Sequence, residues 1–262
     1  MTGKVYLIGA GPGDPELLTV KALRLLQTAD AVFHDDLVSS DILKLIPVQA
    51  QLRKVGKRCG KKNISQQEIN FLMISYAALG MKVVRLKGGD PLIFGRLAEE
   101  IRALGNAGIP FEIVPGVTSA FGAAASIGIP LTDRYISPGL ILLTAQRAHE
   151  NEQIDWRGFI SSGATLVIYM PGHHYPEAAA RLLASGARRE TSCAIVSRAT
   201  TESQQTFITS VDALHRAPQL PAPTLLIVGD VVKFAMNPEW SPRSSPVATA
   251  APEQFPREES VA

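Results

Sequence analysis

Short strand-like runs, most of them apolar, alternate with helical patterns through the first half of the chain. The runs occupy residues 5–8, 31–34, 52–55, 83–86 and 111–114. Between them apolar side chains recur at helical spacing, as from Phe94 through Leu97 to Leu104. Short strands that alternate with helices are typical of an α/β fold. We therefore predict a doubly wound, largely parallel sheet whose loops after the strands meet at one edge.

The expected helix starts carry capping residues. Ser65 with Glu68 three positions later predicts a capping box. Asp14 followed by Pro15 has the form of an N-cap and a first helical residue, and Asp90 before Pro91 repeats it. We expect helices to begin at both prolines, directly after the glycine-rich loops.

The pattern changes after residue 134. Strand candidates follow at residues 140–144, 165–170, 194–197, 206–209 and 225–228, with a helix at 176–185. The close spacing of the last three strands favours hairpins and a mixed sheet. We therefore predict an N-terminal α/β domain at 1–134, a C-terminal α/β domain at 135–240 and a disordered tail at 241–262, which has no periodicity.

Two glycine-rich loops are the clearest candidates for a ligand site. They follow the first and fourth predicted strands, at Gly9–Asp14 and at Gly88 and Gly89. Glycine lets a ligand approach the backbone, and a helix start offers free N–H groups. A dinucleotide fingerprint would need glycine in place of Asp14, and no Gly-Lys-Ser/Thr follows, which excludes a P-loop. We expect a small-molecule site of another kind.

Composition removes several other classes of function. A net charge of +2 over 262 residues argues against a general nucleic-acid binder. Cys59 and Cys193 are too few for a disulfide framework, and the scattered histidines predict no metal site. The N-terminus lacks a signal-peptide layout, and prolines and glycines interrupt the longest uncharged run, 113–132. We expect a soluble cytoplasmic protein without a membrane or nucleic-acid partner.

Three segments in order resemble the tetrapyrrole methylases. They are residues 5–19, residues 85–96 with Glu99 and Glu100, and residues 114–119 with 128–132. The glycine loop alone is shared with diphthine and ribosomal-RNA methyltransferases, whereas the ordered set is specific and spans the chain to about residue 240. The central segment is similar to that of the uroporphyrinogen-III C-methyltransferases. The resemblance implies two α/β domains with a trough between them, S-adenosylmethionine as methyl donor, and a homodimer.

The implied reaction is two successive C-methylations of uroporphyrinogen III, giving precorrin-2 and S-adenosylhomocysteine. Such products feed sirohaem, cobalamin or haem d1 synthesis. An electron-rich pyrrole carbon attacks the sulfonium methyl group, so the protein must position the reactants, neutralise the substrate carboxylates and remove one proton.

The resemblance assigns catalytic roles to Asp35, Lys57, Arg96, Glu99 and Arg134. Asp35 matches the proton acceptor, although a turn or capping aspartate is the ordinary interpretation of its position. Lys57 matches a lysine with a proton-donor or substrate-contact role. The alternative interpretation is a solvent-exposed lysine in a loop. The other three match positions that face the trough, where arginine suits carboxylates; their alternatives are exposed helix or loop residues.

The resemblance also implies a pocket for the methyl donor. Its residues are Pro12, Gly88, Gly89, Asp90, Ile93, Thr118, Ser119 and Met170, with Ala199 and Thr224 as continuations. Alternatives remain at two of them, since Asp90 has the form of a helix cap and Met170 that of a core residue.

Three departures from the family pattern leave other functions open. Thr144-Ala145-Gln146 replaces a common Thr-Gly-His, Leu97-Ala98 replaces Gly-Gly, and His34 replaces a tyrosine. The alternatives are another precorrin C-methyltransferase of the same fold and a non-catalytic protein that has kept the donor pocket.

Overall fold

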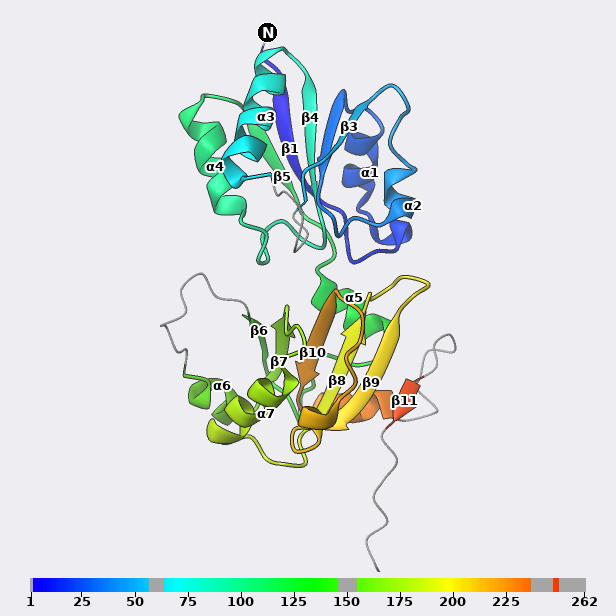
Figure 1. Ribbon diagram of the computed structural model, residues 1–262, viewed down its shortest axis with the longest axis vertical. Helices are drawn as coiled ribbons and strands as arrows, with labels where there is room; N and C mark the ends of the chain where they lie inside the picture. Colours follow the sequence, from blue (N-terminus) through cyan, green and yellow to red (C-terminus); the bar gives the residue numbers. More distant parts are fainter. Residues whose placement is uncertain (1, 57–63, 146–154, 237–246, 250–262) are drawn as a thin grey trace, which may run out of the picture.

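The protein has two lobes, each built on one β-sheet, stacked along the long axis of the molecule (Figure 1). The computed structural model describes residues 2–56, 64–145, 155–236 and 247–249. In Figure 1 the N-terminal lobe lies above the C-terminal lobe, and the strands of the upper sheet run down toward the lower one. The α/β fold with two sheets that the sequence predicts is confirmed.

The sheet of the N-terminal lobe is parallel throughout, in the order β3-β2-β4-β1-β5. Its strands are β1 (Lys4–Gly9), β2 (Ala31–His34), β3 (Gln51–Lys54), β4 (Lys82–Lys87) and β5 (Phe111–Val114). Alternate side chains of the central strands enter separate cores on the two faces, one containing Phe33 and Met73, the other Ile8 and Leu26. The predicted doubly wound sheet is confirmed.

Helices cover both faces of this sheet. They are α1 (Val20–Leu26), α2 (Ser40–Leu43), α3 (Gln66–Ala78) and α4 (Leu97–Asn106), with a 3-10 helix η1 (Pro15–Leu17). The capping box at Ser65 is confirmed, since its hydroxyl accepts from the Glu68 N–H and the Glu68 carboxylate accepts from the Ser65 N–H.

Of the two helices expected to begin at a proline, the first begins there, with Asp14 as its N-cap, and the second begins later. After Pro15 only the short η1 forms, because Leu18 is extended and Thr19 caps a new helix, α1. After Pro91 no helix forms until Leu97, because Phe94 and Arg96 take left-handed φ angles of 52° and 55°. The start predicted at Pro91 was wrong by six residues, and residues 91–96 form a loop that leaves the sheet edge.

The C-terminal lobe has a six-stranded mixed sheet in the order β11-β9-β8-β10-β7-β6. Its strands are β6 (Leu140–Thr144), β7 (Thr165–Tyr169), β8 (Ser192–Ser197), β9 (Gln205–Ser210), β10 (Thr224–Val228) and β11 (Val247–Thr249). β10 pairs antiparallel with β7 and β8, whereas β6 and β7 are parallel. The predicted mixed sheet is confirmed. β11 lies within the predicted disordered tail, which is therefore wrong for residues 247–249; the rest of 241–262 lies outside the described residues.

Helices cover the second sheet as well. They are α5 (Ser119–Ser126), α6 (Arg157–Ser161) and α7 (Tyr175–Ala184), with 3-10 helices η2 (Leu214–Arg216) and η3 (Asp230–Met236). α7 confirms the helix predicted at 176–185. Among the described residues, no helix of either lobe is long and apolar enough to cross a membrane.

Helix α5 belongs by packing to the second lobe, although it precedes the predicted domain boundary. Ala120, Ala123 and Ala124 contact the core that contains Val167 and Val196 (Figure 1). The division into 1–134 and 135–240 stays a prediction, and the packing favours an earlier crossing at residues 115–118.

A surface ion-pair group links α1, β1 and β5 at the far end of the first sheet. Glu112 accepts from Lys4 Nζ at 2.6 Å and also pairs with Lys21. The ammonium groups of Lys21 and Lys4 lower the pKa of Glu112 from 4.5 to about 2. A lowered carboxyl pKa stabilises the folded state above the unfolded pKa, and this contribution disappears as the pH falls through the folded pKa.

We expect Glu112→Gln to reduce the free energy of unfolding at pH 7 by about 1 kcal/mol or less, because solvent screens the pairs. The difference from the unsubstituted protein should shrink below about pH 4.5 and vanish near pH 2. Urea unfolding along a pH series measures it, and a difference that stayed constant from pH 7 to pH 2.5 would contradict the assignment.

Candidate active site

Three loops meet through their glycines at the edge of the N-terminal sheet that faces the second lobe. They follow the neighbouring strands β1, β4 and β5. Gly11 and Gly89 exchange backbone hydrogen bonds of 3.1 and 2.8 Å. A Cβ on Gly9 would lie 2.6 Å from both the Gly116 nitrogen and the Gly89 oxygen. The close approach of three backbones accounts for glycine at these positions.

Asp90 ties two of these loops together. Its Oδ1 accepts from the Leu92 N–H at 2.7 Å and its Oδ2 from the Gly116 N–H at 3.0 Å. The helix-cap interpretation of Asp90 was wrong, because α4 begins only at Leu97. Gly89, with φ of 66°, lies against Ser119, whose Oγ is 3.3 Å from the position of a Cβ. The structure thus brings together four of the predicted donor residues, Gly89, Asp90, Thr118 and Ser119.

A cavity of about 820 Å³ lies between the lobes beside these loops. It is lined from the N-terminal lobe by Pro12, Gly13 and Asp36–Ser39, and from the C-terminal lobe by Met170, Gly172, Arg198, Thr201, Ser203 and Ala222–Thr224. It contains three of the predicted donor residues, Pro12, Met170 and Thr224. Met170 is 40% exposed, so its interpretation as a core residue was wrong. The volume is in the ordinary range for small-molecule sites, roughly 300–1,000 Å³.

Two hydrogen bonds, the first between the lobes and the second within the N-terminal lobe, fix the wall of this cavity. The Asp14 N–H donates to Thr200 Oγ1 at 3.1 Å, and Ser39 Oγ donates to the Gly13 carbonyl at 2.7 Å. A Cβ on Gly13 would lie 3.2 Å from the carbonyl oxygen of Ala199, which places this predicted residue next to the first glycine loop.

Tyr169, which the sequence analysis did not nominate, joins the lobes at a second point. Its hydroxyl lies 2.6 Å from Thr118 Oγ1 and accepts from the Ala120 N–H at 3.1 Å. Its ring lies 5.0 Å from that of Phe94, centroid to centroid. Burial raises the pKa of the Tyr169 hydroxyl, which is therefore a neutral hydrogen-bonding group at the start of α5. The sequence signal that could have identified Tyr169 was its position next to Met170, a predicted donor residue.

A chain of charged side chains runs from the sheet interior to Asp35, at the end of β2. Arg85 Nη2 pairs with Asp35 Oδ1, Arg85 Nε donates to Glu100 Oε1 at 3.0 Å, and Lys87 Nζ lies 3.0 Å from both Glu100 oxygens. Arg85, Lys87 and Glu100 are 2%, 3% and 0% exposed, whereas the side chain of Asp35 is 28% exposed. We name these four residues the buried charge cluster.

Sequence reasoning missed three members of the buried charge cluster. Arg85 and Lys87 alternate with apolar residues in β4, on the face that α3 and α4 cover. Glu100 lies on the apolar side of α4, between Leu97 and Leu104. The sequence did contain a signal for these three residues: they are charged, although the strand and helix periodicity places them on faces that point into the core.

The pKa values of the two cations reflect their mutual surroundings. Burial alone would lower the pKa of Arg85. The carboxylates of Asp35 and Glu100 have a larger, opposite effect, so the pKa of Arg85 is raised overall. Burial, followed by repulsion from Arg85, lowers the pKa of Lys87. Glu100 is the group that compensates both cations.

The remaining predicted residues are placed less centrally. Arg96 and Glu99 pair with each other through two hydrogen bonds of 2.7 Å, which raise the pKa of Arg96. Arg134 is exposed in the turn before β6, and among the described residues it makes no hydrogen bond or ion pair with the others. Ile93 is half-buried in the loop at 91–96. Lys57 lies outside the described residues.

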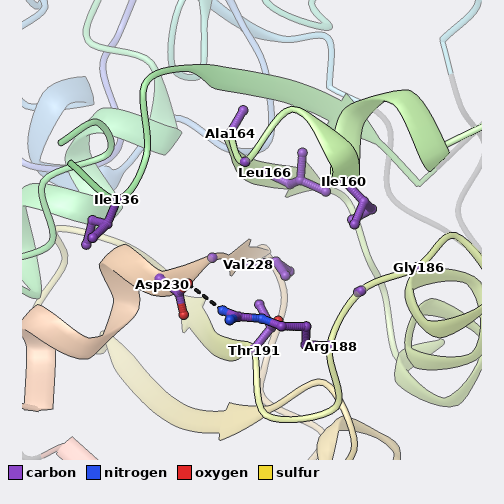
Figure 2. Close-up of a pocket in the computed structure, with 12 residues that line it drawn as sticks. Ile136, Ile160, Ala164, Leu166, Gly186, Arg188, Thr191, Val228 and Asp230 are labelled. Carbon is purple, nitrogen blue, oxygen red and sulfur yellow. Dashed lines mark hydrogen bonds and ion pairs between the residues drawn. The ribbon is translucent and has the colours of Figure 1, made fainter. Parts of the chain in front are cut away.

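A second cavity, of about 270 Å³, lies within the C-terminal lobe (Figure 2). Arg188 and Asp230 close one side of it with an ion pair of 2.6 Å, opposite Ile136 and Leu166. None of the predicted site residues lines it. Elsewhere in the described part of the chain, no group of three or more His, Cys, Asp or Glu side chains could hold a metal ion.

Comparison with known proteins decides the family. The family model of the Tetrapyrrole (Corrin/Porphyrin) Methylases matches residues 4–215. The chain belongs to this family. A relative named Siroheme synthase 1, from Klebsiella pneumoniae, is 44% identical over 245 residues, which cover 93% of the chain and 52% of the relative. This tetrapyrrole methylase thus spans about half the length of the curated relatives it matches.

Solved structures of this family match almost over their full length. A uroporphyrin-III C-methyl transferase from Thermus thermophilus, complexed with S-adenyl homocysteine, is 38% identical with a TM-score of 0.77. The match covers 88% of the chain and 99% of the Thermus protein. A cobalt precorrin-4 methyltransferase is 30% identical with the same TM-score, and the match covers 90% and 96% of the two chains.

Proposed function

We propose that the chain is an S-adenosylmethionine-dependent methyltransferase that converts uroporphyrinogen III to precorrin-2 by two methyl transfers. The observation that carries this proposal is the cavity between the lobes, bordered by the glycine loops and Met170. The likeness to the Thermus transferase and its S-adenyl homocysteine complex supports it. The siroheme synthases among the relatives favour a place in sirohaem formation.

The residues present fit the methyl donor. The close-packed glycines keep the loops at the sheet edge free of side chains, while Leu37, Val38 and Met170 give the cavity an apolar side. When bound, the donor supplies an electrophilic methyl group on a sulfonium. The residues that would hold it are those predicted, Pro12, Gly88, Gly89, Asp90, Ile93, Thr118, Ser119, Met170, Ala199 and Thr224.

The acceptor contacts side chains at the cavity rim. Asp35, beside the lining residues Asp36 and Leu37, accepts the proton that the macrocycle loses after methylation. Arg96 exchanges its partner Glu99 for a substrate carboxylate, and Lys57 and Arg134 contribute further positive charge. The protein acts as a cytoplasmic homodimer.

Incubation of the folded protein with uroporphyrinogen III and labelled donor tests the function. The expected product carries two added methyl groups. Methylation of a different reduced tetrapyrrole in a substrate screen would support another precorrin C-methyltransferase instead. Calorimetry that detected donor binding without turnover on any tetrapyrrole would refute catalysis.

We expect Arg96→Leu to lower kcat/KM for the tetrapyrrole about tenfold, because one charge-assisted hydrogen bond to a carboxylate is lost. The dissociation constant of the donor should not change. Arg189→Leu, which removes an exposed ion pair with Asp212 in the other lobe, is the matched control. Unchanged steady-state kinetics in Arg96→Leu would remove this residue from the substrate site.

A further inference from the structure

The buried charge cluster places three ionised groups where apolar side chains would pack equally well. Buried ion pairs are weak contributors to stability, because desolvation offsets most of the attraction. Arg85 and Lys87 point from β4 toward a face that is otherwise apolar, beneath α3 and α4. Stability therefore does not account for these charges. A role in holding Asp35, next to the cavity-lining residues, does account for them.

The guanidinium of Arg85 is fixed at each of its three nitrogens. Nε donates to Glu100 at 3.0 Å, and Nη1 donates to the carbonyl oxygens of Phe33 at 3.2 Å and Leu86 at 3.3 Å. Nη2 is left for Asp35 Oδ1. A planar fork held in this way can present Nη2 in one direction only.

Glu100 is held as firmly as the guanidinium. Lys87 contacts both of its oxygens, and Gln66 Nε2 donates to Oε1 at 3.2 Å. Arg85 and Lys87 balance the charges of Glu100 and Asp35, so the cluster as a whole is neutral. Its interior part is rigid, and Asp35 is its exposed end.

Asp35 is tied to β4 by its backbone as well. Its N–H donates to the Leu86 carbonyl at 3.1 Å, and β2 and β4 are neighbours in register. Arg85 occupies Oδ1, while among the described residues Oδ2 has no hydrogen-bond partner. The next residues of the chain, Asp36 and Leu37, line the cavity.

We propose that Arg85, locked by Glu100 and Lys87, is a positioning residue that holds the Asp35 carboxylate with Oδ2 toward the acceptor ring. The inference rests on the proposed function. The methylated carbon bears no hydrogen, so the proton moves to Oδ2 from the methylene bridge beside the methylated ring. The electron pair of that broken C–H bond forms a C=C bond and cancels the positive charge of the macrocycle. Arg85 transfers no proton and touches neither reactant.

A double-mutant cycle of Arg85→Met and Asp35→Asn separates positioning from a general structural role. Arg85→Met should lower kcat at least tenfold and leave the donor dissociation constant within twofold. In the Asp35→Asn background the same substitution should change kcat less than twofold, because the carboxylate that it positions is absent. Arg85→Lys, which keeps the charge without the fork, should recover part of the loss.

The controls distinguish the possible failures. Arg189→Met removes a distant arginine–carboxylate pair and should leave kcat unchanged. If Arg85→Met does not fold, the cycle is run with Arg85→Lys. Unchanged kcat in a folded Arg85 variant, or an equal loss in the Asp35→Asn background, would overturn the inference. No methylation by the unsubstituted protein would instead refute the proposed function.

Discussion

Glu100→Gln will lower the free energy of unfolding by about 3 to 5 kcal/mol. The substitution keeps the shape of the side chain but removes its charge. Arg85 and Lys87 are then left as two buried cations, and the one remaining carboxylate, the partly exposed Asp35, pairs with Arg85. Removing one partner of a buried ion pair costs far more than the pair contributes, because the remaining charge stays desolvated.

Urea unfolding measures this loss, and two variants frame it. Glu99→Gln is the matched control, because the adjacent Glu99 makes a half-exposed pair with Arg96 worth less than about 1 kcal/mol. The double variant Glu100→Gln, Lys87→Met removes one charge of each sign and should recover part of the stability. A loss in Glu100→Gln no larger than in Glu99→Gln would show that the cluster is solvated in solution.

The strands were predictable because their signal is local. Five short strand-like runs predicted the strands of the first sheet, and the helices between them predicted its parallel direction. The early end of the helix at Pro15 and the missing helix start at Pro91 were not predictable in this way. A capping pattern does not reveal that Thr19 opens a second helix or that Phe94 and Arg96 take left-handed angles.

The glycine loops were predictable from their own pattern, because they follow predicted strands and precede predicted helices. Asp35 was predictable only because it carries a family motif. Arg85 and Glu100 were missed because their contacts join residues far apart in the sequence, such as Asp35 and Arg85, 50 positions apart. The pairing of Arg96 with Glu99 was also not foreseen, because sequence alone does not give side-chain geometry.

The two proposals depend on one property of the first sheet. Parallel strands deliver every loop to the same edge, so the loops after β1, β4 and β5, which we propose hold the donor, lie beside Asp35 after β2. Glycines hold the proposed donor side together by close backbone contact, whereas charges hold the proposed acceptor side. The two sides should therefore respond to different substitutions.

Gly9→Ala tests the donor side and should have the second large effect. The added Cβ would lie 2.6 Å from the Gly116 nitrogen and the Gly89 oxygen and 2.7 Å from the Gly116 Cα, all backbone atoms that cannot turn aside. We expect unfolding to become easier by about 3 kcal/mol, the upper part of the usual cost of overpacking.

Donor affinity should fall with it, at least tenfold by calorimetry, because the displaced loops carry Asp90 and Thr118. Gly105→Ala in α4 is the control, since its Cβ would meet no atom within 4 Å. There alanine should stabilise the helix by up to about 1 kcal/mol, the opposite sign. Unchanged stability and donor affinity in Gly9→Ala would mean that the three backbones are not packed this closely, and the donor would then have to be held by the side chains of the cavity alone.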